Sequence, residues 1–339
     1  MHHGKISKPI ADGLLELRKR IEQGGIPSSK LDETLNLATW NIREFGKKAR
    51  SDAAIHYIAE ILGQFDLIGI VELRDNLSDL EKVLRILGPY WRAVYSDMIP
   101  DPGGNRERIA YVYDKRAGTF TGFAATATPP RTKKGTEYLP DRSWWRPPYA
   151  ASFQAGNFDF VVIAAHIRWG DSKKARLAEL ELFAEWVTAK RQEATAVDKD
   201  ILVMGDFADG IEARAARQGW RVCGFNLEDE EMFKMLTGYG LKVPDTLVGR
   251  DLGTNLERNK RYDQILHFPQ YPSNFTNAGD VLDFYTGGIK PLFPDLKEKD
   301  KLAFTFQMSD HLPLWVQINT DIDNFVLEQI SKGYRDEAK

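Results

Sequence analysis

Apolar residues along the chain form short runs that predict alternating strands and helices. Mostly apolar runs bounded by turn-forming residues predict strands at 35–42, 66–73, 108–114, 158–167, 200–207, 262–268 and 312–318. Apolar residues at helical spacing predict helices at 11–22, 52–64, 77–87, 172–192, 229–238 and 321–334. Several strands are apolar at nearly every position, which indicates sheets covered on both faces. We therefore expect an α/β or layered α+β protein with its helices outside the sheets.

Length, composition and charge limit the classes of protein that fit. The 339 residues, 42% hydrophobic and 28% charged, provide a large core in one large or two small domains. A net charge of only -3 requires any nucleic-acid contact to come from a local basic patch. The single cysteine, Cys223, excludes an intrachain disulfide, and residues 1–25 contain no apolar stretch long enough for a signal peptide or membrane span. We expect a cytoplasmic protein with no membrane partner, and nothing implies an obligate protein partner.

Polar side chains stand at the ends of the apolar strands. They are Asn41, Glu72, His166, Asp206, Asp263 and the pair Asp310 and His311. For any one of them, a strand that reaches solvent is the favoured explanation. Together at one edge they would supply carboxylates, imidazoles and an amide, without the cysteine or histidine spacing of a zinc site. Such oxygen-rich ligation suits Mg²⁺ or Mn²⁺, and histidine–aspartate pairs suit attack of water on a phosphoester. A serine nucleophile is not expected, because the chain has no GxSxG motif.

Seven short motifs give the chain a family resemblance. They are "LATWNI", "IVELRD", "RIAYVYD", "AAHIRWGD", "MGDF", "YDQI" and "SDHLP". In order and approximate spacing the chain resembles the endonuclease/exonuclease/phosphatase superfamily from about residue 35 to 320. "ELRD", "AAHIRWG" and "RERIAYVY" are more similar to its deoxyribonuclease I branch than to the abasic-site repair branch. The resemblance implies a four-layer sandwich, two packed mixed β-sheets flanked by helices, that hydrolyses phosphodiesters with a divalent metal.

The resemblance also implies which residues hold the metal and activate water. Glu72 would be the metal ligand, with Asn41 beside it binding the metal or the phosphate and Asp310 assisting at the metal. Asp206 would position or deprotonate the attacking water. The implied cofactor is Mg²⁺ or Mn²⁺.

Two histidines would flank the phosphate as general base, general acid or cationic clamps. The resemblance pairs His311 with Asp263 and His166 with Glu107. A carboxylate that accepts a hydrogen bond from a ring N–H fixes the tautomer and raises the pKa of the imidazole, which suits proton transfer.

Basic and aromatic side chains supply candidates for substrate contacts. Arg74 lies two residues beyond Glu72, on the same face if the strand persists, and would then reach a phosphate or the minor groove. Arg146 in "WWRPPYAASF" resembles a substrate-side arginine, although a solvated loop arginine is an equal alternative. Trp144 and Trp145 are candidates for stacking on bases, but packing against protein is the favoured alternative.

One motif departs from the family pattern. The superfamily usually carries Gly-Asp-Phe-Asn, and here Ala208 stands in the asparagine position. Loss of one transition-state donor costs on the order of 10² to 10³ in rate. Joining "MGDF" to "NLEDEEMFKML" would restore the motif, so we interpret 208–225 as a loop insertion and Asn226 as the displaced amide. Asp209 is a further candidate, but its carboxylate would repel the phosphate unless a metal lay between them.

The expected organisation is therefore one catalytic domain with a short segment at each end. Residues 1–34 form a helical extension, 35–320 the catalytic domain, and 321–339 a C-terminal helix. The expected function is a divalent-metal-dependent phosphodiester hydrolase, foremost a deoxyribonuclease I-like endonuclease that acts on DNA. The alternatives are a phosphatase or phosphodiesterase for small-molecule or lipid phosphoesters, and an impaired member that retains metal or phosphate binding.

The interrupted motif yields a first prediction. A variant that joins Phe207 to Asn226 should still fold, because the cost of closing a loop grows slowly with its length. It should hydrolyse substrate faster than the parent by about an order of magnitude, since small displacements at a reacting centre are costly in rate. Steady-state kinetics of both proteins, each with and without Asn226→Ala, tests this. An Asn226→Ala change with no effect in either background would rule out the displaced amide.

Overall fold

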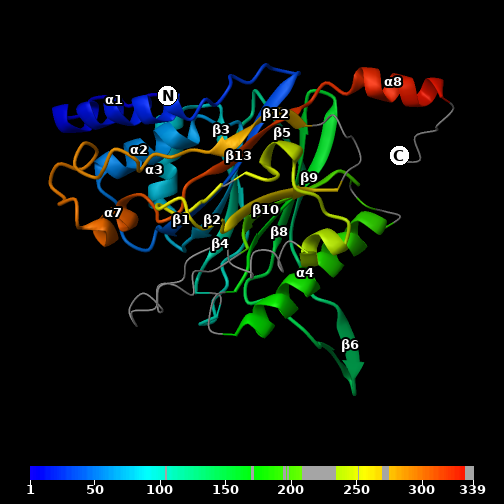
Figure 1. Ribbon diagram of the computed structural model, residues 1–339. Coiled ribbons are helices and arrows are strands. Elements are labelled where there is room, and N and C mark those ends of the chain that lie inside the picture. The colour runs from blue at the N-terminus through cyan, green and yellow to red at the C-terminus, as the bar shows by residue number, and fades with distance from the viewer. Residues whose placement is uncertain are drawn as a thin grey trace.

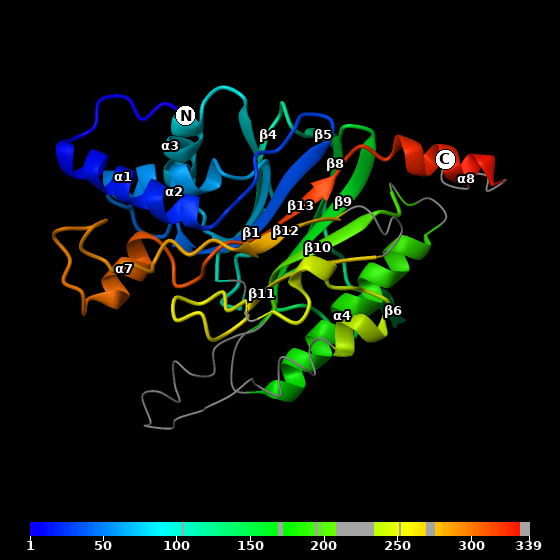
Figure 2. The same cartoon turned by 45° about the horizontal axis from the view of Figure 1, so that its top comes forward.

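Two β-sheets lie face to face at the centre of the computed structural model, which describes residues 1–103, 105–168, 172–193, 196, 198–207, 234–250, 252–268 and 275–332 (Figures 1 and 2). The first sheet has the strand order β12-β13-β1-β2-β4-β3 and the second β11-β10-β9-β8-β5. Strands β1 and β2 are parallel, as are β9 and β10, and the other neighbouring pairs are antiparallel. Both sheets are therefore mixed, as expected.

The strands of the two sheets have the following bounds. The first sheet contains β1 (Thr34–Phe45), β2 (Leu67–Leu73), β3 (Trp91–Tyr95), β4 (Arg108–Asp114), β12 (Phe275–Val281) and β13 (Leu314–Asn319). The second contains β5 (Thr119–Thr126), β8 (Tyr149–Ala155), β9 (Phe158–His166), β10 (Ile201–Asp206) and β11 (Asp263–His267). A separate hairpin is formed by β6 (Arg131–Lys134) and β7 (Glu137–Pro140).

The helices lie outside the two sheets. They are α1 (Lys8–Gln23), α2 (Asp52–Leu62), α3 (Ser78–Leu87), α4 (Lys173–Gln192), α7 (Lys301–Gln307) and α8 (Asp323–Ser331), the last of which extends beyond the sheets (Figures 1 and 2). Helices α1, α2 and α3 lie on one side of the sheets and α4 on the other (Figures 1 and 2). The chain therefore forms the expected four layers. In the described part of the chain, no helix is long and apolar enough to cross a membrane.

Alternation along the strands of the second sheet explains why it is covered on both faces. Val162 and Met204 point into the core shared with the first sheet, whereas Ile163 and Val203 pack with Phe183 of α4. Because successive strand residues face opposite sides, an almost wholly apolar strand must be buried on both.

Close packing between the sheets is fixed by one glycine and one tyrosine hydroxyl. Gly69 on β2 leaves room for Met204 on β10, since a Cβ at position 69 would lie 2.4 Å from the methionine sulfur. The Tyr111 hydroxyl on β4 lies 2.6 Å from the carbonyl oxygen of Tyr149 and accepts a hydrogen bond of 2.8 Å from the N–H of Ala164. Complete burial raises the pKa of Tyr111 well above its ordinary value. This hydroxyl thus joins the first sheet to two strands of the second.

The structure confirms the seven predicted strands and five of the six predicted helices, within a few residues at each end. For the helix predicted at 229–238, residues 234–238 are helical and the earlier ones lie outside the described residues. The elements that were not predicted are β3, β5, β6, β7, β8, β12 and α7. Of these, β5, β6 and β7 expose most of their side chains, so they lack the apolar signal that marked the central strands.

The cross-sheet hydroxyl generates a stability prediction. Tyr111→Phe should lower the free energy of unfolding by about 1–3 kcal/mol, because it leaves a buried N–H without its acceptor. Urea denaturation monitored by circular dichroism measures the change. Tyr95→Phe, on an exposed ring of β3, is the control and should change stability by less than about 0.5 kcal/mol. Equal stability of the two variants would show that the bridge contributes nothing.

Candidate active site

The amide of Asn41, the last residue of β1 paired with β2 before their register shifts, joins the two sheets. Its Nδ2 donates hydrogen bonds of 3.0 Å to Glu72 Oε1 at the end of β2 and of 3.0 Å to Asp206 Oδ2 at the end of β10. The Asn41 side chain is 1% exposed. One buried amide therefore sets the separation of a carboxylate on each sheet.

The backbone around Glu72 departs from regular strand geometry. Glu72 has a φ of 62° and Glu44 a φ of 46°, both in the left-handed region. The registers of the β1–β2 and β2–β4 pairs shift at this place, and the N–H of Glu44 donates a 2.8 Å hydrogen bond to Glu72 Oε2. Residues other than glycine adopt this conformation at a cost, and such strain clusters at functional sites.

Strand pairing places three further polar side chains in a row across the second sheet. Asp206 on β10 is paired with His166 on β9 and with Asp263 on β11. Laterally paired residues point to the same face of a sheet. The row therefore faces the first sheet at the edge where Asn41 and Glu72 lie.

Two imidazoles flank the Asp206 carboxylate. Oδ2 of Asp206 lies 3.7 Å from His166 Nε2 and 3.8 Å from His311 Nε2. Burial raises the pKa of Asp206 to about 6, although both histidines lower it. The carboxylate is thus poised to exchange a proton near neutral pH.

The other ring nitrogen of each imidazole, Nδ1, contacts a second carboxylate. Nδ1 of His311 lies 2.8 Å from Asp263 Oδ2, and Nδ1 of His166 lies 3.0 Å from Glu107 Oε2. Burial lowers the pKa of His311, but Asp263 and Asp206 together raise it well above its ordinary value. Burial and Arg146 lower the pKa of His166, and the nearby carboxylates raise it overall.

Glu107 is the centre of a buried ionic cluster. Oε2 of Glu107 lies 2.6 Å from Arg146 Nε, and Oε1 lies 3.5 Å from Arg74 Nη2 and accepts a 2.9 Å hydrogen bond from Asn105. Burial alone raises the pKa of Glu107, but His166 and the two arginines bring it to about 2. Glu107 is therefore ionised at any pH at which the protein works.

Arg74 lies inside this cluster and not on a shared strand face with Glu72. Strand β2 ends at Leu73, so the condition for that shared face is not met. Arg74 is 4% exposed, and its Nη2 lies 3.3 Å from Glu44 Oε1. Its guanidinium therefore meets carboxylates inside the protein.

The carboxylate of Asp310 pairs with a guanidinium. Its Oδ2 lies 3.2 Å from Arg43 Nη1, and its side chain is 43% exposed. The guanidinium of Arg43 also covers the ring of Phe306 at 4.2 Å. Nowhere in the described ranges do three acidic, histidine or cysteine side chains group closely enough to hold a metal ion alone.

Two oxygens at the site nevertheless fit a magnesium ion. Oδ1 of Asn41 is buried and has no hydrogen-bond partner among the described residues, and the Glu72 carboxylate contacts the same amide. Mg²⁺ is usually bound by one or two carboxylates and completes its shell with water and substrate phosphate. Glu72 and Asn41 therefore fit the protein's share of such an open site.

The structure brings together most of the residues expected from the sequence. Those in contact with one another are Asn41, Glu72, Arg74, Glu107, Arg146, His166, Asp206, Asp263 and His311. Asn226, Asp209 and the proposed insertion 208–225 lie outside the described residues. Trp144 is buried against Trp186, which confirms the protein-packing alternative for that side chain.

Sequence reasoning missed Ser309, which organises the backbone at the site. Its hydroxyl donates a 2.6 Å hydrogen bond to the carbonyl of Asn41 and accepts bonds from the N–H groups of Arg43 and His311. Ser309 is completely buried. The sequence contained a signal that could have identified Ser309, because this residue is the first of the "SDHLP" motif.

Comparison with known structures gives the same fold. An endonuclease/exonuclease/phosphatase family protein from Bacteroides thetaiotaomicron is 17% identical with a TM-score of 0.51, over 85% of this chain and 98% of that one. The human Nocturnin catalytic domain is 16% identical with a TM-score of 0.51, over 86% and 96%. Truncated TDP2 from Caenorhabditis elegans is 12% identical with a TM-score of 0.50, over 84% and 97%.

Comparison with sequence families identifies the relationship. No curated protein sequence matches the chain. The model of the Endonuclease/Exonuclease/phosphatase family matches residues 38–207, half of the chain, from within β1 to just past the end of β10. That stretch contains Asn41, Glu72, Glu107, His166 and Asp206. The chain therefore belongs to the endonuclease/exonuclease/phosphatase family.

Proposed function

We propose that the protein is a divalent-metal-dependent phosphodiesterase that cleaves DNA. The observation that carries the proposal is the Asp206 carboxylate between two imidazoles, each backed by its own carboxylate. Hydrolysis of a phosphodiester needs a group that takes a proton from water and groups that neutralise charge on the phosphate. The site supplies both within one set of contacts.

Asp206 is the proposed general base. Its raised pKa of about 6 keeps it largely ionised at neutral pH while leaving it basic enough to accept a proton from water. The Asn41 amide fixes its Oδ2, so the attacking water is held relative to the phosphate.

His311 and His166 are the proposed donors to the phosphate and the leaving oxygen. Both have raised pKa values, which favours the protonated ring. Their Nδ1 atoms are occupied by Asp263 and Glu107, so their Nε2 atoms face the reaction. Charge-assisted hydrogen bonds from these atoms would stabilise negative charge as it develops.

Glu72 and Asn41 would hold the Mg²⁺ or Mn²⁺ ion. When bound, the ion polarises a phosphate oxygen as a Lewis acid. We assign Asp310 to pairing with Arg43, not to direct ligation, because its carboxylate faces that guanidinium.

Arg146 is the proposed phosphate-binding arginine. Its Nη1 is buried without a hydrogen-bond partner within the described ranges, and the side chain lines a small pocket with Glu72, Glu107 and His166. A free buried donor at that place suits a phosphate oxygen. Arg74 instead supports Glu107, and its reach to a minor groove is not part of the proposal.

Arginine–aromatic pairs at the edge of the site support a nucleic-acid substrate over a small phosphoester. Arg43, which pairs with Asp310 next to His311 in sequence, covers Phe306, and Arg168, two residues after His166, covers Trp145 at 4.4 Å. A polymer would contact positive charge on both sides of the cleaved phosphate. Parallel assays of plasmid DNA, phosphoinositides and sphingomyelin would test the choice between a nucleic-acid substrate and a small or lipid phosphoester.

Removal of the proposed metal ligand generates a prediction. Glu72→Gln should lower the rate of plasmid nicking in Mg²⁺ by at least about a hundredfold, because it removes the negative charge that holds the ion. EDTA should abolish nicking by the wild type, and Mn²⁺ or Mg²⁺ should restore it. Activity of wild-type protein in EDTA, or a wild-type rate of nicking by Glu72→Gln in Mg²⁺, would exclude this mechanism.

The histidine held by Asp263 generates a further prediction. His311→Ala should reduce the kcat of DNA hydrolysis by about 10² to 10³, because it removes a charged donor that would stabilise negative charge on the phosphate. His267→Ala is the control, because His267 lies at the far end of β11 and should leave the kcat within about twofold. Similar kcat values for the two folded variants would remove His311 from the proposed mechanism.

A further inference from the structure

The loop that carries Arg146 and the loop that follows His166, the last residue of β9, emerge side by side from the second sheet. Strands β8 and β9 are antiparallel, and their last pair on this side is Tyr149 with Ala164. Beyond that pair, and as far as residue 168 where the description of this segment stops, no strand ladder joins the segment before β8 to the segment after β9. Arg146 and His166 nevertheless converge on one atom, Oε2 of Glu107, at 2.6 Å and 3.0 Å.

A buried carboxylate on α4 takes the place of the missing ladder. Oε1 of Glu179 accepts a 2.7 Å hydrogen bond from the N–H of Trp145, and Oε2 accepts one of 3.2 Å from the N–H of Arg168. Trp145 directly precedes Arg146, and Arg168 lies two residues after His166. Each oxygen of Glu179 therefore holds one of the two loops.

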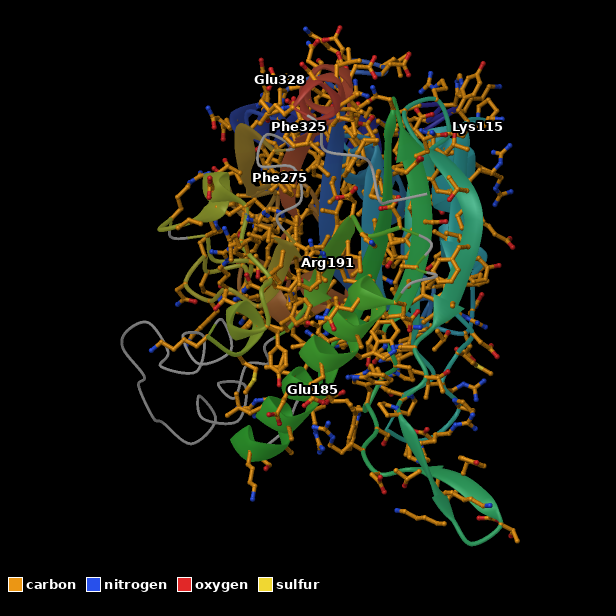
Figure 3. All side chains as sticks on the ribbon, turned by 90° about the vertical axis from the view of Figure 1, so that its right-hand side faces the viewer. Lys115, Glu185, Arg191, Phe275, Phe325 and Glu328 are labelled. Atoms are coloured by element: carbon orange, nitrogen blue, oxygen red, sulfur yellow. The ribbon has the colours of Figure 1, made fainter. Side chains whose placement is uncertain are left out.

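Glu179 is buried, so its carboxylate does not serve as a solvent-exposed charge on the surface of α4. The residue is 4% exposed, and burial raises the pKa of its carboxyl even though the two amides lower it. Removing a carboxylate from water is costly unless hydrogen bonds compensate. Glu185 on the same helix offers the contrast, because its carboxylate is 37% exposed and pairs with Arg142 on the surface (Figure 3).

The two loops also meet on their outer side. The guanidinium of Arg168 lies over the indole ring of Trp145 at 4.4 Å, and the tryptophan is 39% exposed. A guanidinium over an indole ring is attracted to the negative face of the ring. The inner carboxylate and this outer contact together form a clasp, defined here as Glu179, Trp145 and Arg168.

We infer that Glu179 is a positioning residue, which acts through the clasp to hold Arg146 and His166 on Glu107. This inference rests on the proposed function, because its kinetic consequence requires phosphodiester hydrolysis. A displacement of about 1 Å at a reacting group can cost roughly 10² in rate. Glu179 itself touches no substrate or reacting atom in this scheme.

The test compares Glu179→Gln with Glu185→Gln. Glutamine can accept from only one of the two amides, and its NH₂ group would face the other N–H donor. The kcat on DNA should fall about 10- to 100-fold in Glu179→Gln, with KM within about twofold of wild type. Amide hydrogen exchange at Trp145 and Arg168 should rise in the same variant. Glu185→Gln should change neither quantity.

Each result decides the inference. Faster exchange with an unchanged kcat would show that the clasp exists but does not position the site, and unchanged exchange would show that the carboxylate does not hold the loops. If wild-type protein cleaves no phosphoester, the proposed function is wrong, and exchange alone decides whether Glu179 holds the loops. If Glu179→Gln fails to fold, Glu179→Asp takes its place, because it keeps the carboxylate but shortens its reach to the two backbone N–H groups. A wild-type kcat in that variant, together with faster exchange at Trp145 and Arg168, would overturn the inference.

Discussion

The site depends on the contact that the Asn41 amide makes with one carboxylate from each sheet. Glu72 belongs to the first sheet and Asp206 to the second, and the same Nδ2 lies 3.0 Å from an oxygen of each. The sheets must therefore keep a fixed separation at this edge. Gly69 and the Tyr111 hydroxyl set that separation in the core, where a single extra carbon atom would collide with Met204.

Removing the charged groups of the site from water is the main free-energy cost of this arrangement, and their ionic partners offset it. Glu107 is 3% exposed yet fully ionised, because Arg146, Arg74 and His166 surround it. Breaking one partner of such a cluster leaves an unpaired buried charge, which is more destabilising than the loss of a surface pair. The loops that carry these groups consequently need independent support, as Glu179 provides for two of them.

The central strands and most of the site could be predicted because they share one pattern. An apolar run fixes a buried strand, and the polar residue at its end must lie at the sheet edge, which places His166, Asp206 and Asp263 in neighbouring positions. Exposed β5 lacks that pattern, so it was missed. The left-handed turn at Glu72 and the pairing of Asp310 with Arg43 depend on contacts distant in sequence, which spacing does not encode.

The two histidines differ in whether the carboxylate that contacts Nδ1 is shared with other cations. Asp263 has His311 as its ion-pair partner among the described residues, and it raises the pKa of that imidazole well above the ordinary value. Glu107 divides its charge among His166, Arg146 and Arg74, and Arg146 itself lowers the pKa of His166. Within the proposed mechanism, His311 therefore suits a permanent positive charge on the phosphate. His166, which is less strongly biased towards the protonated ring, suits the transfer of a proton to the leaving oxygen.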